Sequence, residues 1–400
     1  MALFPTYTRV PVRVASGSGS ILLDEDGKRY LDFTSGLGVC NLGHCHTAVT
    51  TAVEAQLRQL WHVSNLFHIP LQEQVADLLV QASGLGAVFF CNSGAEANEA
   101  AIKLARKYAR EKRGIERPII LTFRKSFHGR TLATLTATGQ DKVKTGFDPL
   151  PEGFVYATYN DLGSVEEALT PDVAGVFLEL VQGEGGVRPA DPAFVEGLAR
   201  LCADKGVLLM VDEVQTGIGR TGKLFACEHY GIVPDIMTLA KGLGNGMPVG
   251  AMLAKAEYAG VFGPGSHAST FGGNPLAMAA ARAVLTEMKQ SDVLSRAAEH
   301  GTWLITRLKE KLEGRPGVVE VRGLGLMIGI ELNQPVAQVI EAARQRGLLV
   351  SPAGPQVVRL LPPLVTERTQ LEEAVDILTA ALEEVEKGES VSGVGHGGRI

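Results

Sequence analysis

The sequence predicts an α/β protein in which helices cover both faces of a mainly parallel sheet. Three observations support this fold class. Between about residues 70 and 255, short apolar β runs alternate with helical segments, an order typical of parallel sheets. After about residue 275 the order changes to adjacent β runs and helices, which predicts a smaller α+β unit. A chain of 400 residues also exceeds one comfortable hydrophobic core, so we expect two compact units.

The individual elements follow from apolar periodicity and turn residues. An Asp-Gly turn within Ile21 to Phe33 predicts an N-terminal β-hairpin. In the central region, β runs are expected at 88–90, 119–123, 154–156, 173–180, 207–211 and 236–239. Helices are expected there at 71–82, 95–113, 192–205 and 223–230. The last part of the chain is expected to hold a long helix at 275–313, β runs at 318–322, 326–332 and 357–360, and helices at 336–346 and 367–387.

These elements suggest a division into four segments. We expect residues 1–65 to join a small domain, 66–274 to form a large domain, and 275–387 to complete the small domain. Residues 388–400 contain five glycines and almost no apolar mass, which predicts a flexible tail.

The composition excludes several classes of function. No apolar run reaches the ~20 residues of a membrane helix, and the N-terminus has no signal-peptide pattern. A net charge of −6 without a basic stripe argues against a nucleic-acid partner. The five cysteines (40, 45, 91, 202 and 227) are odd in number and contain no Cys-x-x-Cys pair. We therefore expect a cytoplasmic protein with neither a membrane nor a nucleic-acid partner.

A lysine and an acid each follow a predicted strand. Lys241 follows the β run at 236–239 and precedes a glycine-rich turn, and Asp212 ends the β run at 207–211. Because functional groups gather at the carboxyl ends of strands in an open α/β sheet, we expect both at one edge. A buried lysine that loses its proton easily is the amine that forms Schiff bases. Enzymes that use pyridoxal phosphate (PLP) need that lysine, an acidic partner for the pyridine nitrogen and a phosphate cradle.

A candidate phosphate cradle lies between the β run at 88–90 and the helix that follows. Ser93, Gly94 and Ala95 are small residues at a helix N-terminus, where free N–H groups and the helix dipole favour an anion. The same residues also suit an ordinary helix cap, so this motif alone is weak.

Two other motifs point to different chemistry and fail on detail. Gly217 to Lys223 fits the first seven positions of a P-loop, but Leu224 occupies the magnesium-binding Ser/Thr position. The acidic strand also precedes this loop instead of following it, which disfavours a nucleotidase. Cys40 to His46 is dense in possible metal ligands, yet no second ligand pair occurs downstream. We predict no metal site.

Taken together, these segments resemble class III aminotransferases, the fold-type-I, PLP-dependent group that includes ornithine and acetylornithine aminotransferases. The resemblance runs from about Leu22 to Thr366, and its longest motifs lie at 92–99, 126–131, 182–186, 211–217, 241–246 and 269–276. Within the group, 41–46, 63–67 and 139–142 are most similar to the acetylornithine branch. Thr47 and Leu180 stand where relatives often have proline, away from the chemistry.

The resemblance implies roles for the residues of these motifs. Lys241 would be the Schiff-base lysine and Asp212 the partner of the pyridine nitrogen. The other residues implied to bind the cofactor are Ser93, Gly94, Ala95, Phe127, Glu213, Val214, Gln215 and Thr270. Phe127 would stack on the ring, Gln215 would lie by the ring hydroxyl, and Thr270 would come from the neighbouring subunit of a homodimer.

Substrate selection requires cations that bind carboxylates. Arg130 and Arg359 are the candidates, because a guanidinium binds a carboxylate through two hydrogen bonds. Arg359 interrupts an apolar run, so it either pairs with an acid or awaits a ligand. In relatives that acid is Glu184, which we also place among the catalytic residues, and Ser269 is implied to contact substrate.

The implied reaction transfers the terminal amine of N-acetylornithine to 2-oxoglutarate, as in arginine biosynthesis. Ornithine, succinylornithine or another N-blocked diamine remains open as the donor. A PLP-dependent mutase or decarboxylase on this fold is the nearest rival. A PLP-free binding protein would be expected to lose Lys241 or Asp212, and both are present.

Overall fold

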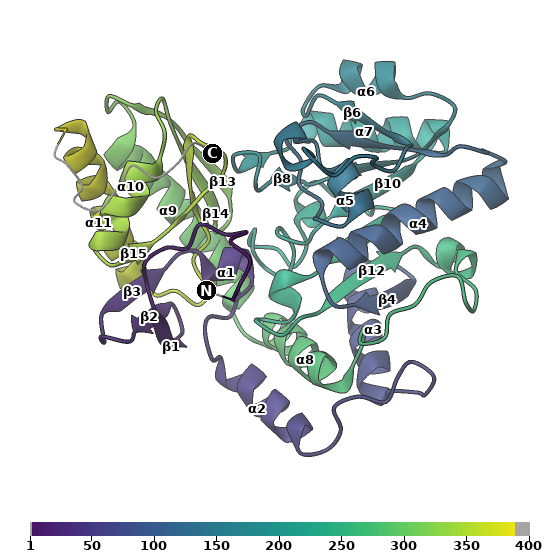
Figure 1. Cartoon of the computed structure of the whole chain (residues 1–400), viewed down its shortest axis with the longest axis horizontal. Coiled ribbons are helices and arrows are strands. Elements are labelled where there is room, and N and C mark those ends of the chain that lie inside the picture. The colour runs from purple at the N-terminus through teal and green to yellow at the C-terminus, as the bar shows by residue number, and fades with distance from the viewer. Residues whose placement is uncertain (1, 389–400) are drawn as a thin grey trace.

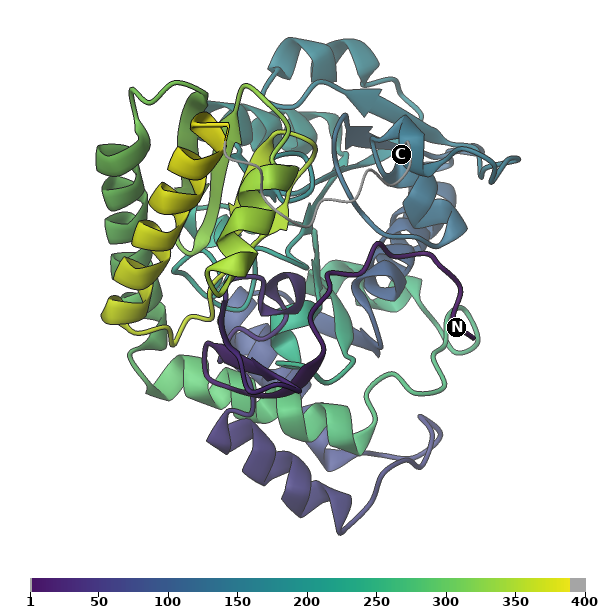
Figure 2. The ribbon, with the colours of Figure 1, turned by 60° about the vertical axis from the view of Figure 1, so that its left-hand side comes forward.

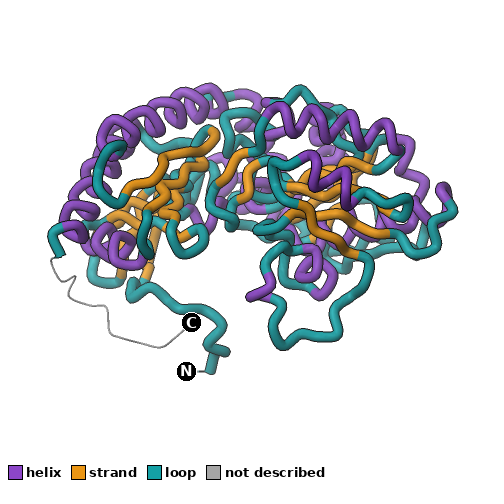
Figure 3. The backbone as a smooth tube through the Cα atoms, turned by 90° about the horizontal axis from the view of Figure 1, so that it is seen from above, coloured by secondary structure: helices purple, strands orange, loops and turns teal. Residues whose placement is uncertain are grey.

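The computed structural model describes residues 2–388, so the predicted tail lies outside the described residues apart from Gly388. Figure 1 shows two groups of elements, one around a large sheet and one that combines the two ends of the chain. Seen from above in Figure 3, helices surround the strands of both groups. No helix within residues 2–388 is long and apolar enough to cross a membrane.

The large sheet has seven strands in the order β4-β12-β11-β10-β7-β5-β6. Their bounds are β4 Ala87–Cys91, β12 Gly250–Ala254, β11 Ile236–Leu239, β10 Leu208–Asp212, β7 Val173–Leu178, β5 Ile119–Phe123 and β6 Phe154–Ala157. Strand β12 is antiparallel to both of its neighbours, and the other pairs are parallel. The predicted fold class is therefore confirmed. Strand β12 was not predicted, because its sequence Gly-Ala-Met-Leu-Ala has little intrinsic β preference.

Alternation along the strands separates the two faces of this sheet. Met210 of β10 packs in one apolar cluster with the buried residues of α4 (Gly94–Arg113). Leu209 and Val211 pack in another cluster, which includes residues of α7 (Pro192–Lys205). Because side chains alternate along a strand, Asp212 faces the α4 side and Glu213 faces away from it.

The second group of elements joins the two ends of the chain. Strands β13 (Val318–Leu324), β14 (Met327–Leu332), β17 (Val357–Leu360) and β16 (Ser351–Pro352) form an antiparallel sheet in that order. A further sheet contains β1 (Val14–Ser18), β2 (Ile21–Asp24), β3 (Arg29–Asp32) and β15 (Leu348–Leu349). The hairpin at 21–33 is confirmed, and Figure 2 shows these N-terminal strands below the C-terminal helices. The division at residues 65 and 274 stays a prediction.

Two predicted helices differ from the structure. The single helix at 275–313 is two helices, α8 (Pro275–Gln290) and α9 (Val293–Leu312). Ser291 is extended and its hydroxyl donates to the Glu287 carbonyl, so the chain turns before Asp292. The helix at 223–230 is only a 3-10 turn at Ala226–His229.

The remaining elements are short segments or helices outside the sheets described above. The other predicted helices are present as α3 (Pro70–Ser83), α10 (Ala337–Gln345) and α11 (Arg368–Glu386). Besides β12, the strands that were not predicted are β1, β15, β16, β8 (Val181–Gln182) and β9 (Arg188–Pro189). The helices that were not predicted are α1 (Ser35–Gly38), α2 (Thr47–Leu57), α5 (Leu132–Ala137) and α6 (Leu162–Ala168), with 3-10 turns at Asp141–Val143, Lys241–Leu243 and Ala256–Val261.

Candidate active site

A cavity of about 390 Å³ opens at the carboxyl ends of β7, β10 and β11. Its volume falls in the usual range of small-molecule sites, about 300–1,000 Å³. Lys241, Asp212, Phe127 and Glu184 are among the lining residues, and the N-terminal turn of α4 closes another side. The edge of the sheet at which the sequence predicts chemistry is therefore the edge that carries the cavity.

Lys241 follows β11 in a tight turn with a φ of 44°. Its ammonium group makes no hydrogen bond or ion pair with residues 2–388, although it lines the cavity. Burial lowers the pKa of Lys241, and the positive charge of Arg359 lowers it further, against the opposing effect of Glu184 and Asp212. An amine with a lowered pKa and no protein partner is suited to react with a carbonyl.

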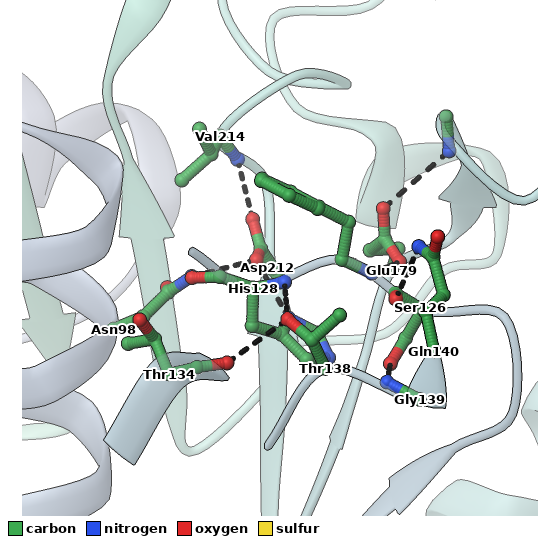
Figure 4. Close-up of polar contacts among 12 residues, drawn as sticks. Asn98, Ser126, His128, Thr134, Thr138, Gly139, Gln140, Glu179, Asp212 and Val214 are labelled. Atoms are coloured by element: carbon green, nitrogen blue, oxygen red, sulfur yellow. Dashed lines mark hydrogen bonds and ion pairs between the residues drawn. The ribbon is translucent and has the colours of Figure 1, made fainter. Parts of the chain in front are cut away.

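Asp212 is held by three donors, which Figure 4 shows around its carboxylate. Asn98 Nδ2 and His128 Nδ1 each lie 2.8 Å from Oδ2, and the Val214 amide lies 2.9 Å from Oδ1. The His128 ring stacks on Phe177, with centroids 4.3 Å apart. Asp212 is thus fixed in orientation as a hydrogen-bond acceptor at the cavity wall.

Asn98 and His128 were not among the predicted site residues. Asn98 is a buried polar residue on the otherwise apolar, sheet-facing side of α4, which is a signal that the sequence carries. His128 lies inside the recognised motif at 126–131, but its contact with Asp212 depends on the fold of that loop.

The N-terminus of α4 has the geometry of an anion cradle. The Ser93 hydroxyl accepts the Glu96 amide at 3.2 Å, so Ser93 is the N-cap. The amides of Gly94 and Ala95 then belong to the first turn, where the helix offers them no acceptor, and both residues line the cavity. A Cβ atom at Gly94 would lie 2.7 Å from Val214 Cγ1, so only glycine fits there. The binding of a phosphate by these residues stays a prediction.

The two predicted substrate cations differ in their surroundings. Arg130 is exposed, lies over the Phe127 ring at 5.6 Å and makes no ion pair within residues 2–388. Arg359 is buried, and its Nη1 lies 2.6 Å from Glu184 Oε1. The expected ion pair between Arg359 and Glu184 is therefore present. Gln215 lines the cavity beside this pair, with its Oε1 3.4 Å from Arg359 Nη1.

Three predicted residues lie elsewhere in this chain. Glu213 is fully buried on the far side of β10, where it accepts the amides of Ala226 and Cys227. Strand alternation explains why Glu213 faces away from the cavity. Ser269 and Thr270 line a separate surface pocket, and the Ser269 hydroxyl binds the Gly272 amide.

The two motifs that the sequence analysis set aside each contain a residue that bonds to another part of the protein. Arg220, in the segment that resembles a P-loop, is buried and donates to Asn41 Oδ1 and to the carbonyl oxygens of Leu326 and Pro362. His44 lies 2.8 Å from Asp32. Within residues 2–388 no cluster of three His, Cys, Asp or Glu side chains is arranged to bind a metal.

The fold and the cavity describe an α/β protein with a lysine at the sheet edge that carries the cavity. The chain belongs to the family described as aminotransferase class-III, whose profile matches residues 4–382. It is an aminotransferase.

Curated relatives and solved structures cover nearly the whole chain. The acetylornithine aminotransferase of Halalkalibacterium halodurans is 55% identical over 382 residues, 96% of this chain and 98% of the relative. That of Bacillus subtilis is 53% identical over 383 residues, 95% and 97% of the two chains. Among solved structures, the ornithine aminotransferase of Toxoplasma gondii has a TM-score of 0.94 at 34% identity, covering 97% and 94%. The N-acetylornithine aminotransferase of Stenotrophomonas maltophilia has a TM-score of 0.83 at 36% identity, covering 96% and 98%.

Proposed function

We propose that the protein transfers the terminal amino group of N-acetylornithine to 2-oxoglutarate, giving the semialdehyde and glutamate. The observation that carries this proposal is the pair formed by Glu184 and Arg359 beside the free amine of Lys241. The similarity to acetylornithine aminotransferases, at up to 55% identity over nearly the whole chain, supports the choice of donor. This reaction belongs to arginine biosynthesis.

PLP is the cofactor that the cavity fits. The amides of Gly94 and Ala95 would hold its phosphate at the N-terminus of α4, and Asp212 would bind the pyridine nitrogen. Phe127 and Val214 line the cavity and would enclose the ring, with Gln215 near its hydroxyl. When bound, PLP supplies an electron sink for the carbanion left by proton loss from the substrate carbon.

The side chains of this chain then have separate tasks. Lys241 carries the proton from the substrate carbon, because its amine has a lowered pKa and no competing partner. Asp212, oriented by Asn98 and His128, supplies a fixed negative charge. Arg130, which has no ion pair within residues 2–388, binds the α-carboxylate of the blocked ornithine.

The two substrates require Arg359 to be paired with Glu184 in one half-reaction and free to bind a carboxylate in the other. With the diamine bound, Glu184 neutralises Arg359, which would otherwise attract a carboxylate. When 2-oxoglutarate enters with its two carboxylates, Glu184 moves aside on its glycine-flanked loop and Arg359 binds the α-carboxylate. One cavity can thus serve a donor with one carboxylate and an acceptor with two.

We further propose a cytoplasmic homodimer in which Thr270 completes the phosphate site of the neighbouring subunit. Thr270 is exposed and outside the cavity of its own chain, which leaves it available to a partner. Activity should then require the dimer, and PLP should stabilise it by linkage. Sedimentation of a fully active monomer at assay concentration would contradict this assembly.

A substrate panel tests the proposed activity. Amino transfer to 2-oxoglutarate should be most efficient, by kcat/KM, with N-acetylornithine among N-acetylornithine, ornithine, N-succinylornithine and N-succinyl-diaminopimelate. A higher value for ornithine would replace the donor and keep the reaction class. Release of carbon dioxide or isomerisation without any amino transfer would reject the aminotransferase mechanism in favour of a decarboxylase or mutase.

A further inference from the structure

Glu179 is a second acid at the carboxyl edge of the large sheet, and the roles proposed above do not use it. It follows β7, the neighbour of β10, where Leu178 pairs with Val211. The next residues in this register are Glu179 and Asp212, and both side chains line the cavity. Glu179 is nevertheless 7% exposed, so its carboxyl group is almost entirely surrounded by protein.

The Glu179 carboxyl joins two loops that are distant in sequence. Its Oε2 accepts the Phe127 amide at 3.0 Å, and its Oε1 accepts the Gly183 amide at 3.4 Å. The first loop, residues 124–131, carries Arg130. The second, residues 179–187, begins with Glu179 itself, contains the short strand β8 and carries Glu184. The Glu179 side chain therefore connects the loop that carries Arg130 with the loop that carries Glu184.

The second loop is also tied to the Arg359 pair. A Cβ atom at Gly183 would lie 2.1 Å from Gln215 Oε1, so the backbone at Gly183 packs directly on Gln215. Gln215 in turn contacts Arg359, which pairs with Glu184. A displacement of Gly183 would therefore disturb the position of Glu184 relative to Arg359.

The surroundings of Glu179 raise its pKa, which suits a bridging side chain in a cavity that binds anions. Burial raises its pKa well above the ordinary value, and the nearby Asp212 charge raises it further. The two backbone amides and Lys241 oppose this shift without cancelling it. A carboxyl with a raised pKa holds its proton more readily, and a protonated carboxyl adds less repulsion toward a phosphate or a substrate carboxylate than a second anion beside Asp212.

We propose that Glu179 is a positioning residue that holds the 124–131 loop and the 179–187 loop in register, and thereby sets how well the enzyme separates its two substrates. This proposal rests on the aminotransferase function proposed above. It assigns Glu179 no contact with a reacting atom. Its effect reaches the chemistry through Phe127 on one side and Glu184 on the other.

Glu179→Gln tests the proposal with little change in size. The amide keeps one acceptor oxygen but presents an NH₂ group to the second backbone amide, so one bridge is lost. Hydrogen–deuterium exchange of the protein without substrate should become about 5-fold faster or more at residues 126–130 or 183–186, the loss of about one hydrogen bond. In single turnovers, the N-acetylornithine half-reaction should weaken more than the glutamate half-reaction.

Glu213→Gln is the matched control. Glu213 is also buried at the end of β10 and also accepts two backbone amides, but on the far side of the sheet. Its substitution should speed exchange at residues 226–227 and leave the ratio of the two half-reactions unaltered. If Glu179→Gln folds poorly, Glu179→Asp replaces it, because its shorter side chain reaches only one of the two loops. The expected exchange and half-reaction changes are the same as those given for Glu179→Gln.

A double variant shows whether Glu179 acts through Glu184. The loss in Glu179→Gln/Glu184→Gln should be smaller than the sum of the two single losses, because both disturb the same contact. Additive losses, or unchanged exchange at both loops, would overturn the proposal. Changed exchange in a protein that does not accept N-acetylornithine would leave the bridge standing and reject the proposed substrate instead.

Discussion

Two cations at the cavity differ in their protein partners from the charged groups where the N-terminal segment contacts the rest of the chain. At the cavity, Lys241 has no hydrogen bond and Arg130 no ion pair within residues 2–388. Around Asp32, by contrast, one carboxylate accepts from Thr34, Ser35 and His44. Arg220 similarly donates from Nη1 and Nη2 to three protein oxygens, while its buried Nε has no partner within residues 2–388.

This difference separates functional from structural charges. A polar group that leaves bonding capacity unused at a cavity wall costs stability, and that cost is retained only where a ligand completes the group. A buried charge that bonds mainly to protein groups holds segments together and is not placed to bind a substrate. Substitutions in the first region should therefore affect turnover, and those in the second should affect folding.

Lys241→Ala should have the largest effect. Turnover should fall by about 10³-fold or more, because the proton-carrying amine is lost. The thermal midpoint of the protein without cofactor should stay unchanged or rise slightly, since a partly buried cation without a protein partner is removed. In the unaltered protein, borohydride reduction should leave cofactor mass on the peptide that contains Lys241. Mass on Lys223 or Lys255 would contradict the assignment.

The sequence predicts a cavity residue well when that residue lies at the end of a strand and its side chain faces the cavity. Lys241 and Asp212 could be predicted because a residue that directly follows a parallel strand lies at the cavity edge whatever the loops do. Glu213 was misplaced because the motif names two adjacent acids, and only strand alternation decides which one faces the cavity. The alternation of apolar residues along β10 places Asp212 and Glu213 on opposite faces of the sheet.

Other features depend on loop structure that no local pattern encodes. The contacts of His128 and Glu179 arise between segments tens of residues apart, so neither spacing nor propensity shows them. Glu179 did carry a signal, since it is an acid within an apolar β run. Strand β12 was missed because its place between β4 and β11 stabilises a weak β former through pairing on both sides.

Arg220→Met should show the opposite behaviour to Lys241→Ala. Three protein oxygens would lose their donor in a buried site, so the free energy of unfolding should fall by about 3 kcal/mol. Urea denaturation measures this loss. The half-reaction rates of the remaining folded protein should change little. A large loss of turnover at unchanged stability would break the distinction between the two regions.

Glu184→Gln should have a smaller effect that falls on one substrate. Arg359 would be uncompensated while the diamine is bound, so that half-reaction should lose about 1–3 kcal/mol of transition-state stabilisation. The glutamate half-reaction should change much less, and Arg359→Ala should instead damage the use of 2-oxoglutarate. Single-turnover spectra resolve the two halves. Equal losses in both would show that the ion pair only supports the fold.

The smallest expected effect is the pH dependence of the contact between His44 and Asp32. The Asp32 hydrogen bond, helped by the Cys40 thiol, raises the pKa of His44 to about 10. Burial raises the pKa of Asp32, but its bonds to His44 and Thr34 outweigh this and lower it overall. A raised histidine pKa contributes stability that is complete below about pH 6.5 and lost as the pH rises through about 10.

His44→Gln should therefore destabilise the protein by about 1–2 kcal/mol at pH 6, with a difference that shrinks steadily toward pH 10. Urea unfolding of both proteins at pH 6, 8 and 10 gives the comparison, and Cys40→Ser in both backgrounds removes the contribution of the thiol. A difference that stays constant over this range would mean that His44 is neutral in the folded protein. Asp32 would then accept only neutral hydrogen bonds, from His44, Thr34 and Ser35, and the contrast with the cavity would be weaker than the geometry indicates.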